Sequence, residues 1–294
     1  MEIAPVHTLN LRGVLTVSKR IILARRWHFF SLSIFFLPLS FHLTIIPTLP
    51  VPDQKLLISY LLYTIIVYIL ALCAIGTITY STHHAFFGQP VKFLDALKSL
   101  SFSFFPLAST AIMANVLILL ISLSFLLFIG TLLMSVHTLG FVIDYNSTYF
   151  MWFLAIVGAI LIAMIIYVHV EWSLAFVVVV VESKWGFAPL MRSSRLVNGM
   201  RSVSLFVMLY FGVCGALGVW VLMWYANLHT VFLTMLAMLF VMMLLLRITA
   251  ANTVLYNYSK ALHGELELDQ VAEGFVEVLD RFVHDYMNFP ALTA

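Results

Sequence analysis

The stretch "YVHVEWSLAFVVVVVES", Tyr167 to Ser183, raises the main question about the fold, because it places His169 and Glu171 inside a long apolar run. A carboxylate at the centre of a membrane span costs about 2.5–3.5 kcal/mol on insertion scales, and most of that cost disappears at the rim. If a span begins near Tyr149, about 20 helical residues bring it to Val168. Glu171 is then predicted to be a rim residue that mainly stabilises structure.

The rest of the chain is similarly apolar, which predicts a polytopic membrane protein. Of its 294 residues, 63% are hydrophobic and only 10% are charged, and the mean hydropathy is +1.07. A soluble domain of this size needs far more polar surface. Six stretches match a bilayer core of about 30 Å, at approximately 28–47, 57–79, 107–132, 149–171, 202–224 and 230–250. The predicted fold class is therefore an all-α transmembrane bundle of six helices in three hairpins.

The basic residues predict the orientation of these spans. Of the 15 Lys and Arg residues, only Lys55 lies in a connector inside a hairpin. The positive-inside rule then places both termini in the cytosol, together with the connectors near 80–106 and 182–201. No short apolar core with a cleavage site precedes the first span, so we expect a retained signal anchor. The predicted parts are a basic cytosolic segment, a membrane domain and a cytosolic tail, at residues 1–27, 28–251 and 252–294.

A second interpretation of the opening stretch places Glu171 deeper in the membrane. The helix could continue through Val181, because no breaker precedes Gly186. The natural partner of Glu171 would then be Arg247, since both charges lie near the inner ends of their spans. Such a pair would act as structural glue or line a polar pathway. The intramembrane or rim charges on which a function could depend are Glu171, Glu182, Arg247 and His169.

The two long cytosolic connectors resemble each other, which indicates an internal repeat. Phe86–Ser109 ("FFGQPVKFLDALKSLSFSFFPLAS") and Lys184–Phe206 ("KWGFAPLMRSSRLVNGMRSVSLF") each contain a Gly, a Pro suited to a first helical turn and an amphipathic stretch. The N-terminal "RGVLTVSKRIILARR" reads as a weaker copy. Basic amphipathic helices beside spans lie in the interface and meet anionic lipid, although topology alone also explains their charges. The expected lipid-headgroup contacts are Lys19, Arg20, Arg192 and Arg195.

The chain becomes acidic from about residue 261 onward. Apolar residues between Val271 and Tyr286 recur at helical spacing, which predicts an amphipathic cytosolic helix. This helix could pack on the basic connectors or dock a cytosolic protein partner. We favour packing within the chain.

Small residues on two spans predict close helix packing. Ala155, Ala159 and Ala163 repeat every four positions in the fourth span, and Gly212 and Ala216 lie in the fifth. Such faces let helix backbones approach closely. They could pack the monomer or form a homo-oligomer.

The sequence shows none of the common catalytic or cofactor motifs. It contains no phosphate-binding glycine loop, zinc-ligand spacing or nucleophile elbow. The adjacent His83 and His84 point to different helix faces and are poor joint metal ligands, so we expect partly solvated histidines at the rim. We therefore predict no catalytic residue, cofactor, metal or nucleic-acid partner, and expect membrane lipids as the main partner.

The segment from Trp172 to Met200 resembles a plant family of uncharacterised six-span membrane proteins, related to the membrane domain beside some glycerophosphodiester phosphodiesterases. The positions that carry the resemblance are Trp172, Leu174, Ala175, Glu182, Gly186, Ala188, Leu190, Arg192, Ser193, Leu196 and Gly199. The resemblance implies a six-span fold in the endoplasmic reticulum, another endomembrane or the plasma membrane. It implies no catalytic activity, because the phosphodiesterase chemistry belongs to a separate domain.

Three classes of function remain open from the sequence. We favour a non-enzymatic membrane protein that acts as a scaffold or as a lipid- or partner-binding organiser. The alternative is an oligomeric ion channel or transporter that uses the rim charges, although its spans carry almost no charge near the midplane. A membrane-embedded enzyme ranks last, because no paired acid and base occur at matching depth.

Overall fold

The computed structural model describes residues 11–45, 54–89, 91–140, 147–225 and 230–265, which form helices joined by turns, with no strand among them. Six helical stretches are long and apolar enough to cross a membrane. The predicted all-α, multi-pass class is therefore confirmed. The candidate spans are Arg26–Thr44, Leu57–Phe86, Phe93–Thr138, Thr148–Glu182, Arg201–Val221 and Phe232–Leu262.

The first span is built from short pieces that follow an amphipathic helix. Helix α1 covers Leu11–Ala24, and the span continues as α2 (Arg26–Ser33), the 3-10 turn η2 (Ile34–Phe36) and α3 (Leu37–Ile45). The tight turn occurs just before Pro38, which has no N–H to donate to the carbonyl of the preceding turn. Proline therefore accounts for the local departure from α-helix.

The second and third spans are continuous helices that extend well beyond the bilayer. Helix α4 runs over Gln54–Phe86 and α5 over Phe93–Thr138. With 46 residues, α5 is about 69 Å long, more than twice the bilayer core. The expected separate amphipathic helix in the first connector is therefore wrong, because this segment forms the first turns of α5 and the helix passes through Pro106.

Within the fourth candidate span, helix α6 ends before the valine run. Helix α6 covers Thr148–Glu171, a turn follows at residues 172–174, and the valine run forms a separate helix α7, Ala175–Glu182. Continuation of one helix through Val181 is therefore wrong. The second connector does contain a separate amphipathic helix, α8 (Ala188–Val197), which buries Leu190, Leu196 and Val197. The last hairpin consists of α9 (Arg201–Tyr225) and α10 (Thr230–Leu262).

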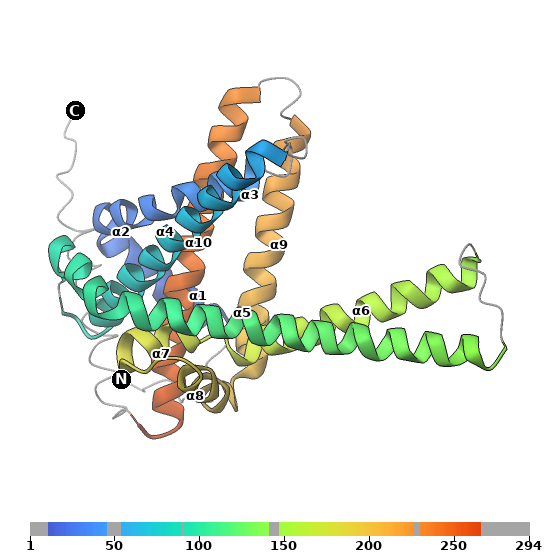
Figure 1. Cartoon of the computed structure of the whole chain (residues 1–294). Helices are drawn as coiled ribbons and strands as arrows, with labels where there is room; N and C mark the ends of the chain where they lie inside the picture. The colour runs from blue at the N-terminus through green and yellow to red at the C-terminus, as the bar shows by residue number, and fades with distance from the viewer. Residues whose placement is uncertain (1–10, 46–53, 90, 141–146, 226–229, 266–294) are drawn as a thin grey trace.

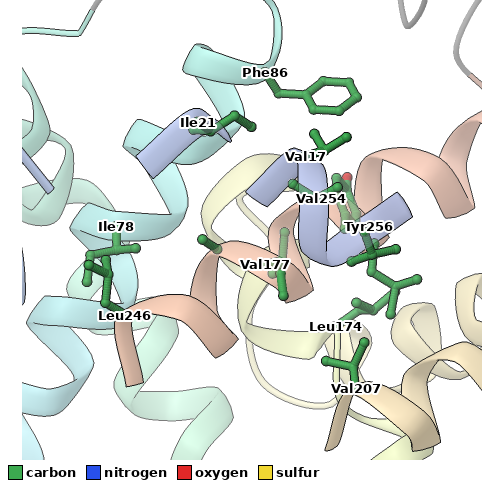
Figure 2. Packing of buried hydrophobic residues seen from close by; sticks show 14 of the residues in the cluster. Val17, Ile21, Ile78, Phe86, Leu174, Val177, Val207, Leu246, Val254 and Tyr256 are labelled. Carbon is green, nitrogen blue, oxygen red and sulfur yellow. The ribbon is translucent and has the colours of Figure 1, made fainter. Parts of the chain in front are cut away.

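Helix α10 lies at the centre of the packed part of the molecule. It contacts α9, α4, α3 and α1. Figure 2 shows the core, to which α1 contributes Val17 and Ile21, and α10 contributes Leu246, Val254 and Tyr256. Residues 253–257 of α10 are buried, so the helix of the sixth span continues past residue 252, the predicted start of the tail. The bundle continues to Leu262.

The α5–α6 hairpin projects away from this core (Figure 1). An apolar stretch of 18 residues in each of α5 and α6 contains no buried residue, whereas 44% of the residues in the corresponding stretch of α4 are buried. The hairpin contacts the rest of the molecule mainly through α5, which packs against α4 and α7, and through smaller contacts of α6 with α8 and α9. We call the end of the bundle that carries α1, α7 and α8 the basic face.

Candidate functional site

Glu171, the last residue of α6, is buried at the basic face and holds three helices together. Its side chain is 8% exposed, and its Oε1 lies 2.7 Å from Nε of Arg201, the first residue of α9. The hydroxyl of Ser194, on α8, donates a hydrogen bond to the other carboxylate oxygen. The charge of Glu171 is thus balanced where α6, α8 and α9 meet.

Ser193 fixes the turn between α6 and α7. Its hydroxyl donates to the carbonyl oxygen of Glu171 at 2.7 Å and accepts a hydrogen bond from the backbone N–H of Leu174 at 3.1 Å. The hydroxyl groups of Ser173 and Ser204 add a contact of 2.8 Å to α9. Buried backbone groups at a helix end need such partners. Side chains of α8 and α9 therefore stabilise the break in the fourth span.

Glu182, the last residue of α7, is the centre of a second ionic group, which we call the Glu182 cluster. The Tyr256 hydroxyl donates to its carboxylate at 2.9 Å, and Arg192 Nε lies 3.3 Å from the same oxygen. The ammonium groups of Lys184 and Lys260 lie 2.7 and 3.9 Å from the carboxylate. The cluster joins α7, α8 and α10.

Arg192 extends the Glu182 cluster to the start of the acidic tail. Its guanidinium forms an ion pair with Glu265, and this hydrogen bond raises the pKa of Arg192. Two carboxylates engage Arg192, so its guanidinium is less available to a lipid headgroup than an unpaired one. Glu265 is the first acidic residue of the tail, and it contacts α8 through Arg192. The predicted helix between Val271 and Tyr286 lies outside the described residues.

Arg247 does not meet Glu171, whose partner is Arg201, so the expected pair is wrong. Arg247 instead lines a groove of about 230 Å³ between α1, α2 and α10, together with Lys19 and Arg26. We call this groove the basic groove, because no carboxylate among the described residues lines it. Its apolar lining consists of Ile22, Leu23, Trp27, Phe30, Met243 and Leu246.

The remaining predicted headgroup and rim residues are Arg195, Arg20 and His169. Arg195 is exposed on α8 and Arg20 is half-buried on α1. His169 is exposed, and its Nδ1 bonds to the carbonyl oxygen of Ile165 in the same helix. His169 therefore makes no contact with the Glu182 cluster.

The predicted small-residue faces are not used to pack one copy of the chain. Ala155, Ala159 and Ala163 are exposed on α6, and Gly212 and Ala216 are exposed on α9. Packing of α9 on α10 uses a neighbouring face. A Cβ at Gly218 would lie 2.2 Å from the ring of Phe240, and one at Gly215 would lie 3.6 Å from Leu244.

A polar pair that the sequence did not predict joins α4 to α10. Nδ1 of His83 lies 3.0 Å from Oδ1 of Asn257, which is fully buried. The two residues are separated by 174 positions, so no local pattern could have connected them. Among the described residues, no group of His, Cys, Asp and Glu side chains is arranged to hold a metal ion.

The comparison with protein families assigns the chain to one of them. A family model described as a domain of unknown function (DUF8558) matches residues 48–291, and the chain belongs to this family. No curated protein and no solved structure matches it.

Proposed function

We propose that this member of the DUF8558 family is a non-enzymatic multi-pass membrane protein that binds anionic lipid through its basic face and acts as a membrane scaffold. The proposal rests on a difference between the acidic and the basic side chains of this face. Glu171 and Glu182 are held in internal ion pairs, whereas many basic side chains stay exposed. The exposed ones include Arg12 and Lys19 on α1 and Arg195 on α8, together with Arg26, Lys92 and Lys98 at the starts of α2 and α5. A hydrogen bond from Arg25 to the Val91 carbonyl joins the starts of these two helices.

The internal ion pairs also favour a scaffold because they give the basic face a defined shape. The contacts of Glu171 and the Glu182 cluster join all the helices from α6 to α10. Removal of one partner from a buried ion pair leaves an uncompensated charge, so the pairs specify one arrangement of these helices. The exposed cations are then presented from a fixed surface.

The balance of charge supports attraction to an anionic leaflet. The only acidic residues whose side chains the structure describes are Asp95, Glu171, Glu182 and Glu265. Each Lys or Arg near an anionic surface contributes about 1 kcal/mol to binding. The positive-inside rule places this face in the cytosol, and the resemblance to plant six-span proteins favours an endomembrane or the plasma membrane.

An oligomeric channel is the second candidate, and the exposed α5–α6 hairpin favours it. The small-residue face formed by Ala155, Ala159 and Ala163 is available to a second copy of the chain. The rim charges give the channel little support, because Glu171 and Glu182 are already paired with Arg201 and Arg192. A carboxylate neutralised in this way contributes little to an ion pathway.

Lipid enrichment around the full-length protein tests the scaffold proposal. The protein is reconstituted into phosphatidylcholine liposomes that contain a minor amount of dansyl-labelled phosphatidylserine or phosphatidic acid. Energy transfer from tryptophan should exceed that to dansyl-labelled phosphatidylcholine and should fall with added salt, since salt screens exposed charges. Equal transfer to all labels would contradict the proposal.

Ion flux in the same liposomes tests the channel alternative. We expect no flux above that of empty liposomes for the wild type or for Glu171→Gln. Flux that changes with Glu171→Gln in correctly folded protein would support the channel instead.

A further inference from the structure

The basic groove has a mostly apolar lining, to which three basic residues also belong. Lys19 and Arg26 come from the N-terminal segment, and Arg247 comes from α10, more than 200 positions away in the sequence. None of the acidic side chains that the structure describes lines the groove. The groove thus offers positive charge without an internal counter-charge.

Arg247 is the residue that most requires an external partner. It lies within the sixth candidate span, Phe232–Leu262, and its side chain is exposed. Within the described part of the chain, no carboxylate pairs with it. Arginine in a span is costly unless its head reaches polar groups at the interface. A phosphate at the inner surface would provide that partner.

The apolar wall distinguishes a lipid from a soluble anion. Trp27 is 74% exposed and Phe30 is 41% exposed beside the groove, and Leu23 and Met243 continue the wall. The guanidinium of Arg26 lies 5.8 Å from the ring centroid of Trp27. An acyl chain can cover these side chains, whereas a free phosphate ion gains nothing from them. Basic pockets between spans on the cytosolic side are a known form of headgroup site.

We infer that the basic groove binds a phospholipid whose headgroup is a phosphomonoester without an ammonium group, phosphatidic acid being the simplest. This inference rests on the proposed function and adds to it the site and the lipid class. A phosphomonoester carries about −1.5 to −2 charges near neutral pH, which matches three cations. The ammonium group of serine, ethanolamine or choline lipids would find no carboxylate in the groove and would be repelled.

Lipid binding to the purified full-length protein tests this inference. Native mass spectrometry would measure the affinity for phosphatidic acid, phosphatidylserine and phosphatidylcholine in the wild type and in two double variants. Lys19→Gln with Arg247→Gln removes two charges from the groove. Lys98→Gln with Arg195→Gln removes the same charge from exposed positions outside it. We expect about a 25-fold loss of phosphatidic acid affinity in the groove variant, about fivefold for each charge. The comparison variant, whose residues act only by diffuse attraction at the basic face, should lose clearly less.

The outcomes separate this inference from the proposed function. Equal losses in the two variants would indicate diffuse attraction, which would overturn the groove site and leave the scaffold proposal standing. A wild type with no preference for anionic lipid would overturn both. Competition by inorganic phosphate as effective as that by phosphatidic acid would overturn the lipid as occupant. The variant Lys19→Arg should retain binding, and an unchanged elution volume and melting temperature would show that the groove variant is folded.

Discussion

Two carboxylates at the basic face, Glu171 and Glu182, are costly to bury, but each is compensated by partners on other helices. Glu171 lies at the end of α6, where its carboxylate pairs with Arg201 and accepts a hydrogen bond from Ser194 instead of contacting water. Glu182 has Tyr256 and Arg192 as partners in the same way. Charge-assisted hydrogen bonds are stronger than neutral ones, and their loss leaves a buried group unsatisfied. Both carboxylates should therefore matter for stability.

Substitution Glu171→Gln should lower the free energy of unfolding by about 1–3 kcal/mol. This value lies below the 3–5 kcal/mol for a fully buried pair, because the Arg201 side chain is 49% exposed and water screens the interaction. Denaturant unfolding of the protein in detergent would measure it. A double-mutant cycle with Arg201→Gln should show coupling, and strictly additive effects would disprove the ion pair.

Substitution Tyr256→Phe should cost about 1.5–3 kcal/mol, because it removes one hydroxyl that donates to the charged Glu182 and keeps the buried ring. Tyr258→Phe on the same helix is a matched control with no hydroxyl hydrogen bond among the described residues, and it should change stability little. The melting temperatures of the two variants would check this. Equal melting temperatures would contradict a role for the Tyr256 hydroxyl.

The break between α6 and α7 depends on contacts from other helices rather than on its own residues. The valine run could extend a helix, yet the chain turns at residues 172–174 because Ser193 satisfies backbone groups on both sides of the turn. The turn directs α7 back to pack against α4 and α5. It thereby places Glu182 near α8 and α10.

Substitution Ser193→Ala should loosen this turn by leaving the Leu174 N–H and the Glu171 carbonyl unpaired. Each unsatisfied buried group costs about 1–3 kcal/mol. Hydrogen exchange should become faster at Leu174 and through α7. Ser99→Ala, which removes a hydroxyl bonded only within its own helix, is the control. Unchanged protection of α7 in Ser193→Ala would contradict the argument.

The whole molecule consists of a packed body around α10, where side chains are buried, and a hairpin whose side chains are mostly exposed. The hairpin formed by α5 and α6 leaves its apolar side chains to lipid or to another copy of the chain. Stability should therefore respond strongly to changes in the body and weakly to changes along the outer part of the hairpin.

Two alanine-to-leucine variants compare the body with the hairpin. Ala250→Leu adds volume at a fully buried position of α10 and should cost about 1–3 kcal/mol or more. Ala159→Leu adds the same volume at an exposed position of α6 and should leave the melting temperature unchanged. The melting temperature of each variant would be measured, and size-exclusion chromatography with light scattering would give the size of its assembly. A lower melting temperature or smaller assembly for Ala159→Leu would show that a second copy covers this face.

The helical class, the number of spans and the amphipathic α8 follow from the sequence because they depend on local composition and on apolar length. The basic character of one end follows in the same way. The partners of the charges do not, because Glu171 and Ser194 are 23 positions apart and Tyr256 and Glu182 are 74 apart. Periodicity carries no information about such pairs. Tertiary packing alone determined that the fourth span breaks at Trp172, that Arg247 joins Lys19 in the basic groove, and that Arg192 is engaged by carboxylates, because each depends on which helix ends meet in space.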